Sequence, residues 1–174
     1  NTPGAFEDAM HAKGLLDART EGFSANAERG GDEPYIIPMV FHIIHNNGVE
    51  NITDAQVYDA VRILTNDYTK QNADWPNVRP EFLDIVADVN IEFRLATLDP
   101  EGNCTNGITR TVSTQTYDGD FEMTQLIQWP RDQYMNIWVA ASAGSGVAGY
   151  TYYPQWLDNW PEADGIVIGH NYVG

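Results

Sequence analysis

Two segments of this chain are apolar at nearly every position, and they constrain the fold more than any other feature. The first runs from Ile36 to His45, and the second is Gly165-Ile166-Val167-Ile168. Such runs are typical of strands that are buried on both faces rather than on one. A strand of this kind needs cover on both sides of its sheet, which helices normally supply. The sequence therefore predicts an α/β fold around these two strands.

A helix and a further strand follow the first run. Thr53 stands three residues before Gln56, as in a capping box. An apolar face with helical spacing follows and predicts a helix that runs to about Lys70, comprising Val57, Ala60, Val61, Leu64 and Tyr68. Residues 89–95 then alternate apolar and polar, which predicts a half-buried strand. Strand, helix and strand together form a βαβ unit with a right-handed crossover.

Three more strands complete the predicted sheet, over residues 136–140, 147–153 and 165–168. Pro154 ends the middle one, and proline is usually confined to strand ends and sheet edges. The fold class is thus α/β, with a twisted mixed five-stranded sheet and a long crossover helix over residues 35–174. Residues 1–34 differ in composition, with polar linker chemistry around Gly30-Gly31. We interpret them as an N-terminal arm, either a pro-segment or a leader to the domain.

The charge of the chain excludes several kinds of partner. With 25 acidic and only 9 basic residues, the net charge is −16. A chain this acidic is repelled by nucleic-acid phosphates and by anionic lipid, so we expect neither nucleic-acid nor membrane partners. No apolar run approaches the ~20 residues of a membrane-spanning helix. Cys104 is the single cysteine, so no internal disulfide can form.

No residue of this chain is predicted to be catalytic or to bind a metal. His42 and His45 suggest a metal site, but residues three apart on a strand point to opposite faces, so we expect structural roles. Asp118-Gly119-Asp120 lacks the rest of a calcium-binding loop and is interpreted as a turn. The sequence holds neither a nucleophile elbow nor a phosphate-binding loop. From the residues alone, this chain is a sheet scaffold without a reaction centre.

Several sequence blocks nevertheless resemble one family when they are read in order. The blocks are residues 35–44, 51–56, 87–93, 105–110, 129–139, 149–150 and 164–168. Together they resemble the pappalysin-type (ulilysin-like) secreted zinc metallopeptidases of the metzincin clan. The resemblance spans about Tyr35 to Gly174.

The resemblance implies that residues 35–174 are the N-terminal, upper subdomain of a catalytic domain, truncated just before the zinc helix. In the family that helix carries H-E-x-x-H-x-x-G-x-x-H, whose histidines hold zinc and whose glutamate is the general base. The zinc ligands would then lie outside this chain, and calcium is a further ion that the parent enzyme could hold. The resemblance also implies a secreted, extracellular protein that acts on protein or peptide substrates. The fragment itself is expected to be inactive, and its oligomeric state is not predicted.

One family role has a matching place in this sequence. In metzincins the fourth strand borders the cleft, and an extended substrate adds to it through backbone hydrogen bonds. Here that strand is residues 147–153, and the predicted substrate-binding residues are Ala148, Gly149, Tyr150 and Thr151. Gly149 would let a peptide backbone approach closely. The alternative is that the tyrosines only pack the sheet and Gly149 is a bulge.

A second hypothesis concerns the whole chain. It would be a complete, non-catalytic module that binds or inhibits peptides and lacks the zinc helix altogether. The two hypotheses predict the same sheet and the same peptide-binding edge. They differ in whether a zinc helix continues the polypeptide after Gly174.

Overall fold

The structure is a computed structural model that describes residues 10, 11, 13–15, 17, 18 and 33–174. Most of the predicted arm 1–34 therefore lies outside the described residues. The strands are β1 (Tyr35–His45), β2 (Ile91–Leu95), β3 (Ile108–Val112), β4 (Met135–Ala140), β5 (Gly149–Thr151) and β6 (Ile166–Gly169). The helices are α2 (Asp54–Tyr68), α3 (Phe121–Thr124) and α4 (Pro154–Leu157). Short 3-10 helices η1 to η5 cover Trp75–Asn77, Pro80–Ile85, Thr114–Tyr117, Pro161–Ala163 and His170–Tyr172.

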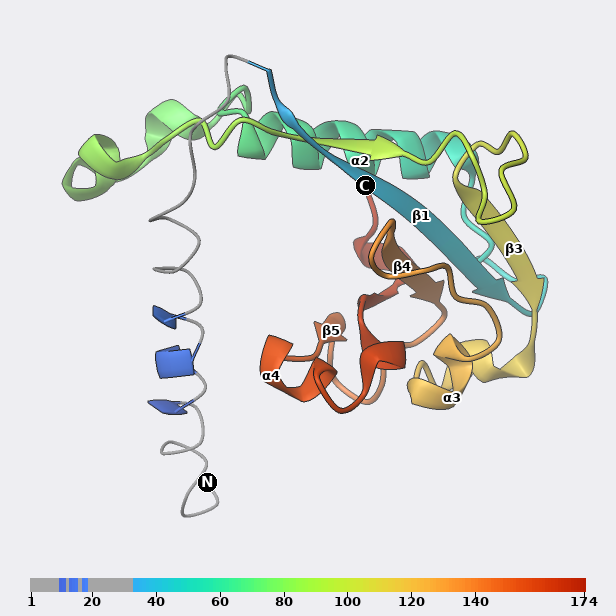
Figure 1. Cartoon of the computed structure of the whole chain (residues 1–174). Coiled ribbons are helices and arrows are strands. Elements are labelled where there is room, and N and C mark those ends of the chain that lie inside the picture. Colours follow the sequence, from blue (N-terminus) through green and yellow to red (C-terminus); the bar gives the residue numbers. More distant parts are fainter. Residues whose placement is uncertain (1–9, 12, 16, 19–32) are drawn as a thin grey trace.

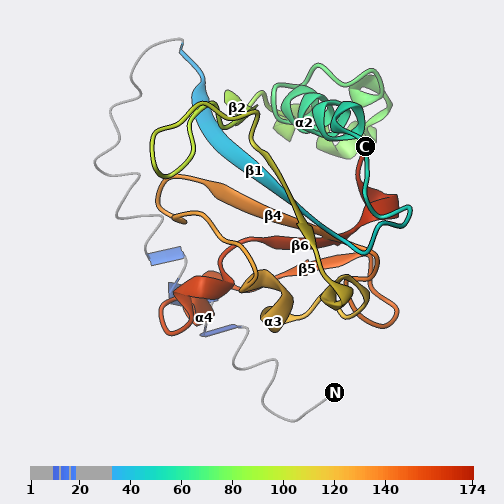
Figure 2. The ribbon, with the colours of Figure 1, turned by 90° about the vertical axis from the view of Figure 1, so that its right-hand side faces the viewer.

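These strands form one mixed, mostly parallel sheet in the order β2-β1-β4-β6-β5, as the fold class predicts (Figures 1 and 2). Only β5 is antiparallel to its neighbour. The sheet also holds β3, which was not predicted. Residues 35–39 of β1 pair with β2 and residues 41–45 pair with β3, so these two short strands share one edge of β1. The long β1 therefore accommodates a sixth strand without widening the sheet.

The crossover helix α2 begins as predicted and ends two residues early. The Thr53 side chain accepts a hydrogen bond from the Gln56 N–H at 3.3 Å, which caps the helix. The Gln56 side chain takes a different role from that of a capping box, because its amide donates to the Val173 carbonyl at 2.6 Å. The first turn of α2 therefore anchors the segment that follows β6.

Two apolar clusters lie on opposite faces of the sheet. On the face that carries α2, the cluster includes Phe41, Ile43, Val57, Val139 and Val173. On the opposite face, the loops and α3 cover a second cluster that includes Ile44, Met123, Trp138, Ala140 and Val167.

On the face that carries α2, the half of the sheet formed by β6 and β5 is only partly covered. Figure 2 shows α2 beside β1 and β2, with β6 and β5 farther away. Val167 of β6 is buried, whereas Ile166 and Ile168 on the other face of the strand are only partly buried. The last strand is therefore covered fully on one face only.

His42 and His45 both have structural roles, as the alternation of a strand predicts. The buried His42 ring contacts Thr109 Oγ1 through Nδ1 at 2.7 Å and Asn136 Oδ1 through Nε2 at 3.0 Å. His45 Nδ1 accepts from the Asn47 N–H at 3.2 Å. Burial lowers the pKa of His42 to about 4, so the ring is neutral at pH 7. The His42 ring therefore links β1 to β3 and β4 through side-chain hydrogen bonds, in addition to the backbone pairing of these strands.

Candidate functional site

The free edge of β5 is the part of this sheet where another backbone can pair. In the described part of the chain, β5 pairs with β6 on one side and with no strand on the other. The strand is shorter than the predicted 147–153, since the strand pairing with β6 covers only Gly149–Thr151, and α4 begins at Pro154. The unpaired backbone N–H and C=O groups of an edge strand can pair with an added strand.

The pairing with β6 decides which of the predicted residues face outward. The Gly169 N–H donates to the Ala148 carbonyl at 2.8 Å, so these two residues are a hydrogen-bonded pair. Antiparallel pairs alternate, so Tyr150 and Val167 form the next bonded pair. Gly149 and Thr151 then direct their backbone N–H and C=O groups away from β6. Of the four predicted residues, only these two offer backbone groups to a peptide.

The Tyr150 side chain packs the sheet, which agrees with the alternative that the sequence left open. It packs against the cluster around Trp138, and its hydroxyl donates to the Gly119 carbonyl at 2.9 Å. Burial, with smaller contributions from the nearby Tyr152 and Asp120, raises the pKa of Tyr150 to about 12. Gly119 lies in the predicted turn, where Asp120 caps α3 by accepting from the Met123 N–H.

The close approach of β6 requires glycine at position 149. A Cβ atom at this position would lie 2.7 Å from the Val167 carbonyl oxygen and 3.2 Å from the Ile168 Cα. The register between β5 and β6 continues through Gly149 without an extra residue, so the alternative of a bulge is wrong.

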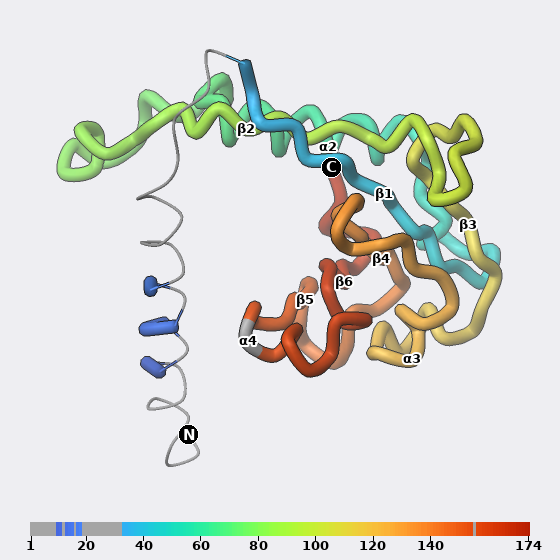
Figure 3. Tube along the Cα trace, viewed as in Figure 1, coloured from blue at the N-terminus to red at the C-terminus, as the bar shows by residue number. Residues whose placement is uncertain are grey.

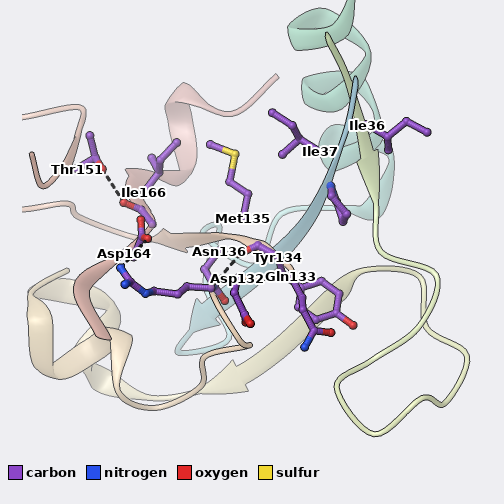
Figure 4. Close-up of a pocket in the computed structure, with 13 residues that line it drawn as sticks. Ile36, Ile37, Asp132, Gln133, Tyr134, Met135, Asn136, Thr151, Asp164 and Ile166 are labelled. Atoms are coloured by element: carbon purple, nitrogen blue, oxygen red, sulfur yellow. Dashed lines mark hydrogen bonds and ion pairs between the residues drawn. The ribbon is translucent and has the colours of Figure 1, made fainter. Parts of the chain in front are cut away.

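A groove of about 470 Å³ opens beside the end of β5, on the side of the sheet where the parallel strands begin. Its apolar wall is formed by Ile36, Ile37, Met135 and Ile166, and its polar rim by Arg131, Asp132, Gln133 and Asp164 (Figure 4). Arg131 and Asp164 form an ion pair at 3.2 Å. Thr151 belongs both to the groove and to the edge, and its hydroxyl donates to the Gly165 carbonyl at 2.8 Å.

The residues that the structure describes do not fit a zinc ion. Among them, no three His, Cys, Asp or Glu side chains converge to form a metal site. Both nitrogens of the buried His42 ring are already engaged, and Cys104 is exposed. No helix of the described part is long and apolar enough to span a membrane.

Comparison with solved structures shows that this α/β fold, with its mixed, mostly parallel sheet and one long helix, is similar to the catalytic domain of a metallopeptidase. One such relative is mirolysin of Tannerella forsythia, a metallopeptidase of the pappalysin family of metzincins, and this chain resembles part of it. Mature mirolysin in complex with a cleaved peptide is 35% identical, with a TM-score of 0.75. Mirolysin with a bound compound is 34% identical, with a TM-score of 0.74. A promirolysin mutant, E225A, is 30% identical, with a TM-score of 0.78.

The extent of these matches matters for the function. This chain spans 55% to 60% of the mirolysin chains, so it resembles part of that peptidase. The mirolysin structures with the cleaved peptide and with the compound cover 83% of this chain, and the pro-form covers 100%. No protein-family model and no curated protein matches this sequence.

Proposed function

We propose that this chain is the N-terminal part of the catalytic domain of a secreted zinc-dependent endopeptidase, and that β5 aligns its peptide substrate. The observation that carries the proposal is the 35% identity to mature mirolysin over 83% of this chain. That relative was solved with a cleaved peptide, which supports peptides as the substrate class.

In this proposal, the described residues bind and align the substrate and do not carry out the reaction. The zinc ligands would come from the portion of such an enzyme that corresponds to the unmatched 40% to 45% of mirolysin, since this chain covers 55% to 60% of it. When bound there, zinc would activate a water molecule for attack on the peptide bond. The backbone groups of Gly149 and Thr151 would hold the peptide extended, in line with the sheet.

Two observations support the proposed domain organisation. The apolar wall of the groove and the partly buried Ile168 form a surface of the kind that a further helix covers. In addition, the pro-form of mirolysin matches the whole chain, whereas the mature form covers 83% of it. The difference of 17% is close to the length of residues 1–34, which supports their assignment as a pro-segment.

The alternative is a non-catalytic module that binds peptides along the same edge. Reading the coding sequence beyond the codon for Gly174 separates the two. The proposal expects H-E-x-x-H within a few turns of helix, and peptide hydrolysis by the longer product that a zinc chelator abolishes. A stop codon at that point, or a longer product that binds peptide without cleaving it, supports the module instead.

Substitution of Thr151 tests the proposed edge. Thr151→Pro removes an outward N–H and no ladder bond to β6, so the sheet keeps its pairing. We expect the affinity for an acetylated decapeptide of alternating valine and lysine to fall about three- to tenfold, as the loss of one hydrogen bond implies. Fluorescence anisotropy of the labelled peptide measures this change.

Thr151→Val is the matched control. It keeps the backbone N–H and the shape of the side chain, and it removes only the hydroxyl bond to Gly165. We expect this variant to bind the decapeptide within about twofold of the unmodified chain. Equal affinities for the proline and valine variants would show that the peptide does not pair with this edge.

A further inference from the structure

A continuous row of aromatic rings leads away from β5. The Tyr150 and Tyr152 rings are T-shaped, with centroids 5.6 Å apart. Tyr152 stacks on Trp156 of α4 at 6.4 Å, and Trp156 meets Trp160 edge-on at 6.2 Å. Since α4 follows β5 closely in the chain (Figures 1 and 3), this row runs from the edge strand to α4 and beyond.

The outer rings of this row are open to solvent. Trp156 is 51% exposed and Trp160 is 56% exposed, and neither belongs to an apolar cluster of the described chain. By contrast, Trp129 and Trp138 are buried, and the Trp138 indole N–H donates to the Ile127 carbonyl. Adjacent exposed indoles cost solubility, so their clustering beside a binding edge points to a ligand.

We infer that Trp156 and Trp160 form a platform for a basic side chain of the peptide that pairs with β5. This inference rests on the proposed function, because continuity with the β5 edge identifies the ligand as that same peptide. Indole faces are electron-rich and attract lysine and arginine cations. The net charge of −16 favours a basic peptide over an acidic one. The chain already contains one such contact, in which Lys70 Nζ lies 4.4 Å from the centre of the Trp75 ring.

The platform also has a defined position relative to the peptide. Trp156 and Trp160 follow the carboxyl end of β5 in the chain. A peptide that runs antiparallel to β5 would meet them with its amino-terminal part, and a parallel peptide with its carboxyl-terminal part. Decapeptides with a single lysine near one end or the other therefore also report the direction of binding.

Nuclear magnetic resonance of the ¹⁵N-labelled chain tests the inference directly. The five tryptophans give five indole N–H signals, which single Trp→Phe variants assign. On titration with the lysine decapeptides, we expect the signals of Trp156 and Trp160 to shift together with the backbone amides of Gly149 and Thr151. The signals of Trp75, Trp129 and Trp138 should stay in place.

Affinity measurements supply the chemical control. Replacing the lysine of the peptide by norleucine keeps its length and removes its charge. We expect that replacement, and separately Trp156→Leu, to weaken binding about two- to fivefold, as the loss of one exposed cation–π contact implies. Since Trp156 is half exposed, the thermal unfolding midpoint of Trp156→Leu should match that of the unmodified chain.

The outcomes separate this inference from the function on which it rests. Shifts at Gly149 and Thr151 without shifts of the two indoles, or equal affinity for the norleucine peptide, would overturn the platform and leave the edge intact. Unchanged amides would contradict the proposed edge itself. Indole shifts that depend on protein concentration without peptide would identify a contact between two copies and overturn the inference as well.

Discussion

Acidification from pH 6.5 to pH 4 should remove about 3 kcal/mol of stability through His42 alone. Burial holds the pKa of this ring at about 4 in the folded chain, against 6.5 in its absence. Each unit of difference corresponds to about 1.4 kcal/mol. The folded state is therefore favoured fully above pH 6.5, where the ring is neutral in both states. Below that pH only the unfolded state takes up the proton, so stability falls until the folded ring is protonated near pH 4.

The hydrogen bonds of His42 explain why the neutral ring suits this place. Asn136 Oδ1 already accepts from the Trp129 N–H, so it acts as an acceptor toward the Nε2–H of His42 as well. Nδ1 then accepts from the Thr109 hydroxyl. One proton on the ring satisfies both contacts, whereas a second proton would bring an unpaired charge into the core.

Urea unfolding at half-unit pH steps measures the effect. The matched variant is His42→Gln, which keeps a polar side chain and has no proton to gain. Carboxylates titrate in both proteins, so the difference between the two stability curves isolates His42. We expect that difference to shrink by about 3 kcal/mol from pH 7 to pH 4. A constant difference across this range would show that His42 does not titrate as its burial implies.

Asn136→Leu should cost about 3 to 5 kcal/mol of unfolding free energy at pH 7. The Asn136 amide bridges three buried groups, since it accepts from the Trp129 N–H, donates to the Trp129 carbonyl at 2.9 Å and accepts from His42. Leucine has a similar volume, but it leaves all three groups without a partner. A buried polar group without a partner costs about 1 to 3 kcal/mol.

Asn46→Leu is the control for this substitution. The Asn46 side chain makes one exposed hydrogen bond to the Tyr117 hydroxyl at 3.3 Å. Its replacement should change the unfolding free energy by less than about 0.5 kcal/mol. Urea denaturation at neutral pH compares both variants, and a loss below about 1 kcal/mol for Asn136→Leu would contradict the bridging role.

The regular elements of this fold were predictable because their signals are local. The apolar face from Val57 to Tyr68 and the cap at Thr53 predict α2. The alternation in residues 89–95 predicts β2, although the strand itself begins only at Ile91. β3 could not be predicted in the same way, because Ile108–Val112 is short and its three central residues are all polar. It becomes a strand only because β2 leaves the second half of β1 unpaired.

The position of β5 at the edge of the sheet was predictable, but the backbone groups that it leaves free were not. Pro154 after a short strand indicated an edge. The register between β5 and β6 decides which backbone groups of that edge are free. This register cannot be predicted from the sequence of β5 alone. The need for glycine at position 149 comes from Val167, and the hydrogen bond of Tyr150 comes from Gly119. Both partners are distant in sequence, so no pattern within residues 147–153 could have indicated them.

The sequence by itself determined the α/β class, the long central strand β1, the crossover helix and the opposed orientation of His42 and His45. These follow from side-chain periods of 2 and 3.6 residues, which each segment carries alone. The tertiary structure decided the place of β3, the outward groups of Gly149 and Thr151, the neutral His42 and the exposed row at Trp156 and Trp160. Each of these features depends on a backbone segment or ring that is distant in sequence and adjacent in space. The packing of the sheet decides which segments become adjacent.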